Sequence, residues 1–336
     1  MRVIVTDHHD IPYDTDENDI RVYKVPEADA VIDHKQPGCE YPCKELCGAG
    51  VAYKFIQLLY RMCGIPEAEC EAFIEILGIA TVCDVMNLVD ENRIIVREAL
   101  HRLSDSSNYG LKALITNSGR DDKKLSAFDL GFIIGPCINA AGRLGDAKTS
   151  LEFLLETDSF KANERAIELL NINNTRKDMT EQGTKTAIGL LETSDHLLMG
   201  AVPETGVAAL SDRVLVMYIP KLHESLVGII AGRIKERYYR PVLLFTDSEE
   251  EGIIKGSGRS IEGYNMYDEI NKCSDYFTKF GGHEMAAGFS MEKRNLARLR
   301  EKMNANCTLD EKLLTPKLRI DVPMPLDYVS IPLTEE

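Results

Sequence analysis

The sequence predicts an α/β fold, with two α/β domains joined by a long helical connector. Short aliphatic runs alternate with amphipathic helical segments in both halves of the chain, which is typical of α/β domains. A proline-free helical stretch separates the halves, and 336 residues favour two domains of ordinary size over one. We therefore expect domains at 1–150, 196–308 and 309–336, the last only the start of a domain, with the connector at 151–195.

In the first half, β-branched residues 3–5 predict a short buried strand that stops at a polar turn. Residues 28–32 predict a second strand, and the apolar spacing at 48–62 predicts a helix. Residues 68–83 predict another helix, which ends at Asp84. Alternating strands and helices imply a parallel sheet.

The connector is helical in pattern from 149 to 192, with Asp158 as a plausible N-cap. Its intermittent apolar stripe is expected at Phe160, Ile167, Leu170 and Ile188. In the second half, short strands at 214–218 and 242–245 bracket a helix at 226–238, and a polar helix follows at 294–306. Four prolines within 316–332 suggest the opening of a further element.

The composition narrows the functional classes. Lys and Arg number 39 against 54 Asp and Glu, so the net charge of −15 argues against a general nucleic-acid coat but not against a nuclease with local basic clusters and metal ions. No apolar run reaches the ~18 residues that a membrane span needs, and the first residues do not resemble a signal peptide. We expect a cytoplasmic protein that has no membrane partner. Nine cysteines indicate reduced thiols; Cys39, Cys43 and Cys47 match a zinc motif only weakly.

The turn Asp7-His8-His9 follows the first predicted strand. Ligands of open parallel sheets collect beyond the carboxyl ends of the strands. Imidazole and carboxylate groups there suit manganese and related divalent ions. A chance polar turn is an equally good reading of these three residues alone.

Three further segments carry candidate residues. Asp84, after an apolar helix, is by itself more typical of a cap. The segment GPCINAAGRLGDA at 135–147 offers Asn139 and Arg143 beside three glycines, and a simple Gly-Pro turn is the alternative. GSGRS at 256–260 and FGGHEMAAGF at 280–289 fit a phosphodiester backbone, although plain turns or a structural His283 explain them equally well in isolation.

In this order, the segments resemble the RecJ-type single-strand-specific DNA exonucleases of the DHH superfamily. TDHHD resembles the family's name-giving motif, and YPCKELCGAGVAYK, CDVMNLVDENR and GPCINAAGRLG follow in the family's order. HESLVGIIAGRI, KGSGRS and FGGHEMAAGF resemble the DHH-associated substrate domain. On this resemblance the domain at 1–150 is a partial DHH domain and the domain at 196–308 the DHH-associated domain.

The resemblance implies a two-metal phosphodiesterase, using Mn²⁺ or Mg²⁺, that degrades single-stranded DNA from its 5′ end in DNA repair and recombination. It implies that His8 and Asp84 are metal ligands, that His9 contacts the scissile phosphate, and that Asp7 steadies the metal-site histidine. Of these, Asp7, His8, His9 and Asp84 would be catalytic. The implied substrate-binding residues are Asn139, Arg143, Ser257, Arg259, Ser260, Gly281, Gly282 and His283.

The sequence also departs from the family's pattern. The Asp-rich metal motif and a further Asp that precede DHH in relatives have no counterpart here, so we expect little or no nuclease activity from this chain alone. We also expect an exposed surface that favours self-association. Residues 318–333 are expected to be only the first strand of a C-terminal nucleic-acid-binding domain. Cys137 stands where many members have Arg, and Asp33-His34 where Asn-Pro is common.

Other readings are a DHH-family phosphodiesterase of short oligonucleotides or cyclic dinucleotides, and a non-catalytic fragment that binds nucleic acid. The segment GPCINAAGRLG and the long connector favour the RecJ branch over the first of these. A pyrophosphatase of the same superfamily would need neither GSGRS nor the connector.

Overall fold

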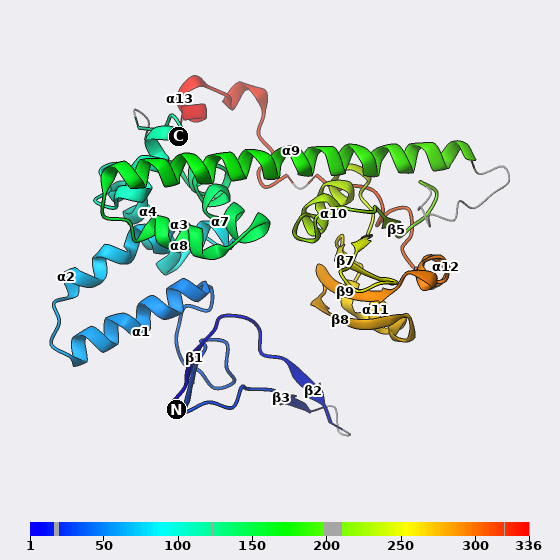
Figure 1. Ribbon diagram of the computed structural model, residues 1–336, viewed down its shortest axis with the longest axis horizontal. Coiled ribbons are helices and arrows are strands. Elements are labelled where there is room, and N and C mark those ends of the chain that lie inside the picture. Colours follow the sequence, from blue (N-terminus) through cyan, green and yellow to red (C-terminus); the bar gives the residue numbers. More distant parts are fainter. Residues whose placement is uncertain (17–19, 122–123, 198–209, 319, 336) are drawn as a thin grey trace. The chain divides into compact units, whose positions relative to one another are not determined.

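The computed structural model describes residues 1–16, 20–121, 124–197, 210–318 and 320–335. The chain forms two compact units, Met1–Arg176 and Lys177–Glu336 (Figure 1). Both contain helices and strands, as the α/β prediction requires. Among the described helices, none is long and apolar enough to cross a membrane.

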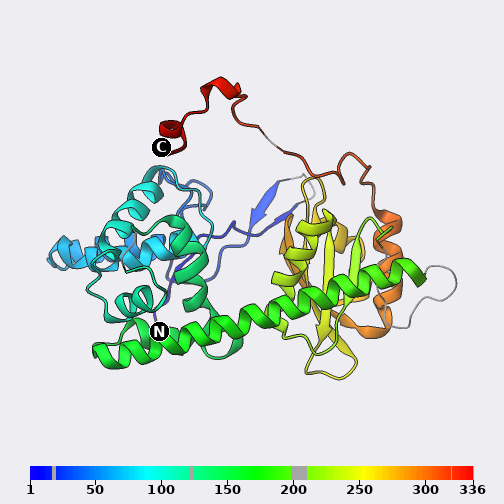
Figure 2. The ribbon, with the colours of Figure 1, turned by 90° about the horizontal axis from the view of Figure 1, so that it is seen from above.

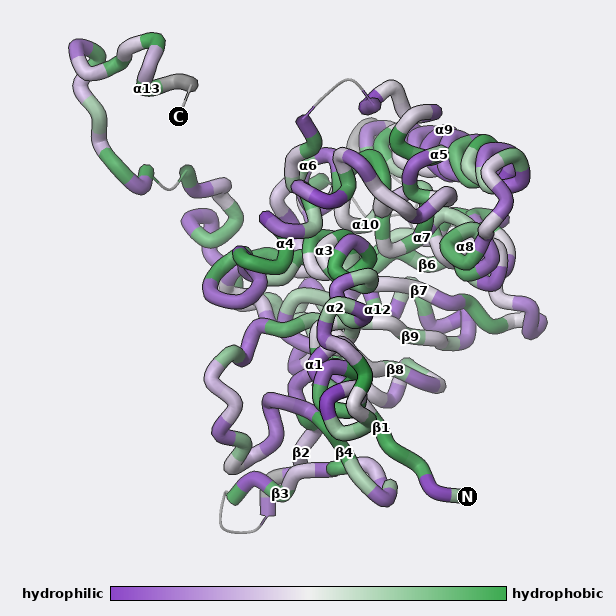
Figure 3. Tube along the Cα trace, turned by 90° about the vertical axis from the view of Figure 1, so that its left-hand side faces the viewer, coloured by the Kyte–Doolittle hydropathy of each residue, from purple (hydrophilic) through white to green (hydrophobic). Residues whose placement is uncertain are grey.

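The first unit holds a short parallel strand pair. β1 (Ile4–Thr6) pairs with β4 (Ala30–Ile32), with Val5 opposite Val31. The predicted burial of the first strand is wrong: Ile4 is 52% exposed, although Figure 3 shows β1 in the colour of hydrophobic residues. The reason is that β4 is the only strand paired with β1 among the described residues, so neither strand is interior to a sheet. A separate antiparallel pair joins β2 (Tyr13–Thr15) and β3 (Arg21–Tyr23).

The helices of this unit pack around α3 (Ile74–Cys83), which is apolar on all sides. The predicted helix α1 spans Gly48–Met62. The single helix predicted over 68–83 is wrong, because a 3₁₀ turn without buried side chains separates a short α2 from α3. Residues 135–144 form a helix, which corrects the Gly-Pro turn alternative. The other bounds are α2 Glu67–Cys70, η1 Glu71–Phe73, α4 Asp90–Leu103, α5 Tyr109–Asn117, α6 Ala127–Asp129, the π-helical turn η2 Leu130–Ile134, α7 Gly135–Leu144 and α8 Ala147–Leu154.

The connector is one continuous helix, α9 (Ser159–Leu197), of 39 residues. Asp158 caps it as predicted, since its carboxylate accepts the backbone N–H groups of Phe160 and Lys161 at 2.9 and 3.1 Å. The predicted apolar stripe is wrong in part: Phe160 is 70% and Ile167 42% exposed. Other aliphatic side chains make the buried face instead; these are Ala162, Ala166, Leu169, Ala187 and Leu191.

The second unit is built on a five-stranded sheet of order β5-β6-β7-β9-β8 (Figure 2). β5 and β6 are parallel, and the other pairs are antiparallel. The glycine-rich segments lie within β7 and in the β8–β9 hairpin rather than in plain turns. The bounds are β5 Leu215–Tyr218, α10 Glu224–Tyr238, β6 Val242–Asp247, β7 Ile253–Arg259, α11 Met266–Asn271, η3 Ser274–Tyr276, β8 Phe277–His283, β9 Ala286–Glu292, η4 Lys293–Asn295 and α12 Leu296–Asn306.

The second half of α9 packs closely on α10 within this unit. A Cβ added at Gly183 would lie 2.5 Å from Cδ1 of Ile230, so glycine is needed for this approach. After α12, the strand predicted at 318–333 is wrong: the described residues there form η5 (Leu326–Tyr328) and α13 (Ile331–Glu335). Pro323 and Pro325 cannot donate to a ladder, and none of the strands that the structure describes pairs with this segment.

Candidate active site

The turn after β1 is folded around the carboxylate of Asp7. The backbone N–H of Asp7 donates to the carbonyl of Ile32 at 3.0 Å, which holds the turn beside β4. Asp7 Oδ1 accepts the backbone N–H groups of His8 and His9 at 2.7 and 3.3 Å and lies 2.7 Å from Nδ1 of His9. Partial burial raises the pKa of Asp7, but these hydrogen bonds lower it more, to about 2. Asp7 is therefore ionised; it orients the imidazole of His9 and holds the backbone of both histidines.

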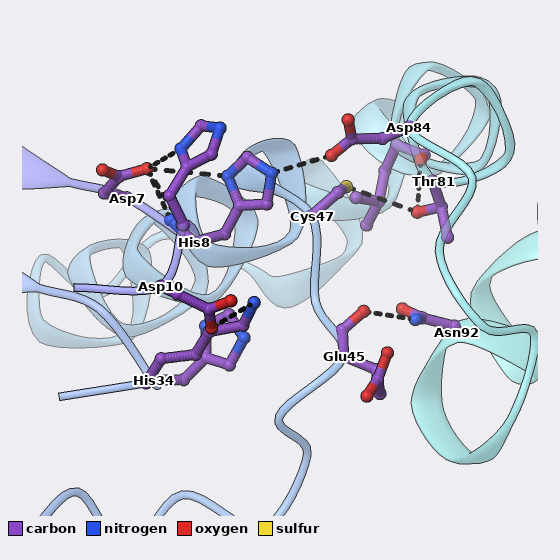
Figure 4. A network of polar contacts seen from close by, with 12 residues as sticks. Asp7, His8, Asp10, His34, Glu45, Cys47, Thr81, Asp84 and Asn92 are labelled. Atoms are coloured by element: carbon purple, nitrogen blue, oxygen red, sulfur yellow. Dashed lines mark hydrogen bonds and ion pairs between the residues drawn. The ribbon is translucent and has the colours of Figure 1, made fainter. Parts of the chain in front are cut away.

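His8 points from this turn toward the end of α3. Its Nε2 lies 2.8 Å from Oδ2 of Asp84. Figure 4 marks this contact with a dashed line. The His8 side chain is only 18% exposed, whereas that of His9 is 76% exposed. The structure thus brings His8 and Asp84 together across 76 positions of sequence. Asp7 hydrogen-bonds the His9 ring, and its distance to Nδ1 of His8 is 3.6 Å.

Asp84 is held by the way α3 ends. It is the C-cap, and the next residue, Val85, has a left-handed backbone with φ of 57°. The N–H of Met86 donates to the carbonyl of Thr81 at 3.2 Å, which closes the helix end as a Schellman motif does. Glycine usually occupies the left-handed position, so a β-branched residue there is strained. The strained residue adjoins Asp84.

Gly48, the first residue of α1, lies directly beside the ring of His8, the partner of Asp84. A Cβ at Gly48 would lie 3.1 Å from Nδ1 of His8, so the backbone of the helix approaches the ring closely. Cys47, the N-cap of α1, contacts Thr81 of α3 through Sγ and Oγ1 at 3.6 Å (Figure 4). Sequence reasoning gave Gly48 no role, although a glycine at a helix start within CGAG was the available signal.

The geometry fits a divalent cation shared by His8 and Asp84. Two ligand atoms at about 2.1 Å from one ion and at right angles to each other are about 3 Å apart, close to the observed 2.8 Å. Asp7, His8 and His9 also form a group whose ligand atoms lie within 4.8 Å of one another. Among the residues that the structure describes, no second group of three or more such side chains occurs.

Helix α7 lies against the end of α3 that carries Asp84. A Cβ at Gly135 would lie 2.0 Å from Sγ of Cys83, so only glycine allows this approach. Asn139 and Arg143 of α7 are exposed. Cys137 is buried and accepts a hydrogen bond from Asn173 at 3.3 Å, so this position does not reach the surface.

Arg259 of the second unit is fixed by its own strand and by α10. Its Nη1 donates to Oγ of Ser257 and to the carbonyl of Gly258, both at 2.8 Å. A Cβ at Gly228 of α10 would lie 2.6 Å from Nη2 of Arg259, so this glycine makes room for the guanidinium. Gly228 is another residue that sequence reasoning missed; it lies in the quoted segment HESLVGIIAGRI without a periodicity that marks it.

The remaining predicted substrate-binding residues of the second unit differ in how accessible they are to a ligand. Ser260 is buried, and its hydroxyl donates to the carbonyl of Tyr264, which favours a structural role over phosphate binding. His283 is exposed at the end of β8, and its Nδ1 accepts the N–H of Met285 at 3.3 Å. Gly281 is exposed with open space around it, whereas a Cβ at Gly282 would lie 2.3 Å from the carbonyl oxygen of Ala286.

Comparisons with known proteins match both units. A family model described as DHHA1 domain matches residues 211–308. The single-stranded-DNA-specific exonucleases RecJ of Bacillus subtilis and Escherichia coli are 33% and 36% identical over 98% and 96% of this chain. A crystal structure of exonuclease RecJ bound to manganese is 30% identical, has a TM-score of 0.70, and matches 90% of this chain and 68% of its own. This chain belongs to the RecJ family.

The match covers only part of the longer RecJ proteins. The chain spans 38% of the Bacillus subtilis protein and 55% of the Escherichia coli protein. A crystal structure of Thermus thermophilus RecJ in complex with Mn²⁺ has a TM-score of 0.71 over 90% of this chain and 41% of its own. The α/β fold predicted from the sequence is confirmed by these RecJ structures. Their bound ions support a divalent metal in the family.

Proposed function

We propose that this chain carries part of the active site of a metal-dependent phosphodiesterase that degrades single-stranded DNA from its 5′ end. The observation that carries the proposal is the 2.8 Å contact between His8 Nε2 and Asp84 Oδ2. Relatives named for this activity cover nearly the whole chain and support the same substrate. The 5′ polarity rests on the family resemblance alone.

In this proposal His8 and Asp84 hold Mn²⁺ or Mg²⁺, and Asp7 orients the histidine turn. Bound divalent ions lower the pKa of water and offset charge on the phosphate oxygens. His9, which is exposed beside the pair, contacts the scissile phosphate. The Asp7 carboxylate holds the proton of His9 on Nδ1, which leaves Nε2 of His9 directed outward.

Candidate contacts to single-stranded DNA are assigned in each unit separately. Asn139 and Arg143 are exposed on α7, next to the end of α3. Ser257, Arg259 and His283, with the open backbone at Gly281 and the neighbouring Gly282, supply donors for phosphate oxygens in the second unit. Ser260 is buried and holds the end of β7 in place through its hydrogen bond to the carbonyl of Tyr264.

The described residues provide one metal position rather than two, so we expect weak Mn²⁺ binding and slow or absent hydrolysis by the 336-residue chain. The test compares wild type, Asp84→Asn and Asp10→Asn on a 3′-labelled single strand with Mn²⁺. Asp10 is the control because its side chain is 93% exposed and pairs with Lys35. Any hydrolysis is expected to begin at the 5′ end and to be lost only in Asp84→Asn.

Binding provides a second readout that does not need turnover. In EDTA we expect the chain to prefer a single strand over a duplex, with affinity that falls as salt rises. Equal affinity for both, or cleavage that persists in Asp84→Asn, would contradict the proposal. Preference for two- or three-nucleotide substrates would favour the oligonucleotide phosphodiesterase instead.

Two finer expectations accompany this proposal. The exposed strand β1, with Ile4 52% exposed, favours self-association, which sedimentation velocity at several protein concentrations measures. A single sedimenting species of monomer mass throughout would refute it. We also propose a cytoplasmic location, because the substrate of the proposed activity, single-stranded DNA, lies in the cytoplasm of bacteria. Fractionation of cells tests this location.

A further inference from the structure

Two phenylalanines on the surface of the first unit stack on each other. The ring centroids of Phe128 and Phe132 are 4.8 Å apart, and the ring planes differ by only 24°. Phe128 is 60% and Phe132 65% exposed, so neither ring belongs to a core. Single exposed apolar residues are ordinary, but two nearly parallel aromatic faces turned to solvent form a platform on which a third flat ring could continue the stack.

This pair, which we call the aromatic platform, is part of the segment that packs on the end of α3. Its two residues flank Leu130, whose carbonyl lies 3.7 Å from Sγ of Cys83. A Cβ at Gly131 would lie 3.3 Å from Cγ1 of Val82. Val82 and Cys83 directly precede Asp84, so the backbone that carries the platform packs on the end of α3 that leads to Asp84, within the same compact unit.

The backbone at the platform is irregular. Phe132 lies in the π-helical turn Leu130–Ile134, and such turns are frequent at functional sites. Ser126 and Asp129 hydrogen-bond each other in a capping box that fixes the start of this segment.

We propose that the aromatic platform binds nucleobases of the single strand by stacking. This inference rests on the proposed function and adds a base contact to the phosphate contacts assigned above. Base stacking on aromatic rings tolerates every sequence because each base has a π-face. Asn139 and Arg143, exposed farther along the same helical run, supply polar contacts for the backbone of the same strand.

The test uses the full 336-residue chain in EDTA, so that no hydrolysis occurs. The variant Phe128→Leu/Phe132→Leu keeps apolar side chains but removes both ring faces. The control is Phe160→Leu, since Phe160 is 70% exposed on α9 of the same unit. Fluorescence anisotropy compares a labelled 20-nucleotide oligo-dT with an abasic strand of the same length, which has the phosphates but no bases.

The double variant is expected to bind oligo-dT roughly tenfold to hundredfold more weakly than wild type. Its affinity for the abasic strand should equal that of wild type, and Phe160→Leu should change neither affinity. An unchanged affinity for oligo-dT would overturn the inference while leaving the proposed function intact. Equal losses of affinity for oligo-dT and for the abasic strand would also overturn it, because the contribution of the rings would then not depend on bases.

Two further outcomes would also refute base stacking on the aromatic platform. If wild type binds neither strand better than duplex, the proposed function and this inference fail together. If sedimentation shows that wild type is dimeric and the double variant monomeric, the platform is an interface between copies of this chain, and base stacking is refuted. Circular dichroism and urea unfolding of each variant establish that it is folded before binding is measured.

Discussion

Among the described residues, the parallel strand pairs β1–β4 and β5–β6 differ in what lies at their carboxyl ends. At β5–β6, the last residues of the two strands, Tyr218 and Asp247, hydrogen-bond each other, so the end of the pair is closed by its own side chains. At β1–β4, the turn after β1 is held beside β4 by its backbone and places His8 against Asp84 on a helix end.

The difference shows that a parallel strand end alone does not identify a site. Both ends carry ionisable groups, as the general rule for open sheets allows. The two strand ends differ in the partners of these groups. At one end the groups hydrogen-bond each other, and at the other they face a side chain of a different element that can also bind a metal ion. At β5–β6 Lys293 donates to Tyr218 at 3.0 Å and completes a local network. At β1–β4 the partner comes from α3, so a ligand can be shared between two elements.

The largest expected effect tests this distinction directly. His8→Ala should reduce Mn²⁺ affinity by at least about tenfold, because it removes one of the two facing ligands. Tyr218→Phe, the matched change at the other strand end, should leave Mn²⁺ affinity unchanged. Isothermal titration calorimetry and electron paramagnetic resonance of free Mn²⁺ measure both. Similar losses in the two variants would erase the distinction between the strand ends.

A second prediction extends the comparison to the next strand of the larger sheet. Gly228→Ala should weaken binding of single-stranded DNA by about tenfold, or about 1.4 kcal/mol, because its new Cβ displaces the Arg259 guanidinium. Gly232→Ala is the control on the same helix, since nothing lies within 4 Å of its Cβ position. Alanine favours helix at both sites, but only Gly232→Ala should gain stability, because the new Cβ at Gly228 collides with a guanidinium that holds two hydrogen bonds. Equal DNA affinities of the two variants would contradict the role given to Gly228.

A third prediction sharpens the comparison through backbone strain. Val85 and Lys221 both have left-handed backbones, and each adjoins one of the two carboxylates: Val85 follows Asp84, and the N–H of Lys221 donates to Asp247. Val85→Gly and Lys221→Gly should each stabilise the chain by up to about 1 kcal/mol in urea unfolding, since glycine relieves the strain at some entropic cost.

Only Val85→Gly should also change metal binding, lowering Mn²⁺ affinity a few-fold by loosening Asp84. If both glycine variants gain stability and neither alters Mn²⁺ binding, the strain beside Asp84 has no part in positioning it.

The smallest effect is a pH dependence at the closed strand end. The hydroxyl of Tyr218, followed by the N–H of Lys221, lowers the pKa of Asp247 below its ordinary 3.8. Because the folded state binds this proton more weakly than the unfolded state, the stabilisation is present above 3.8 and is lost as pH falls through the lowered value. Asp247→Asn should therefore flatten the acid side of the stability curve in urea unfolding. A variant with an unchanged acid side would show that Asp247 contributes nothing there.

Much of the fold could be predicted because its patterns are local. The apolar spacing of α1 predicted its bounds, and Asp158 predicted the start of α9. Burial could not be predicted, since it depends on neighbours far away in the sequence: Ile4 in β1 is exposed, whereas Val216 in β5 is fully buried. The glycine-rich strands were also missed, because glycine favours turns locally and only pairing with β6 and β9 makes β7 a strand.

The candidate site was predictable in its residue types but not in its contacts. Family resemblance pointed to His8 and Asp84, and the structure brings them together. No local pattern could show that Asp7 would hydrogen-bond His9 or that Ser260 would be committed to the core, because both depend on the path of the chain. The supporting glycines were missed for the same reason: what makes Gly48 and Gly228 special is the atom beside each of them, not their neighbours in sequence.

The close approach of Gly183 to Ile230 bears on how the protein can be dissected. The segment recognised as a DHHA1 domain begins at residue 211, yet α10 within it rests on a helix that starts much earlier. A fragment trimmed to the recognised segment would expose Ile230 to water and lose a wall of its own core. The shortest piece with a complete interior must therefore include the second half of α9, so the unit of packing is larger than the unit of sequence resemblance.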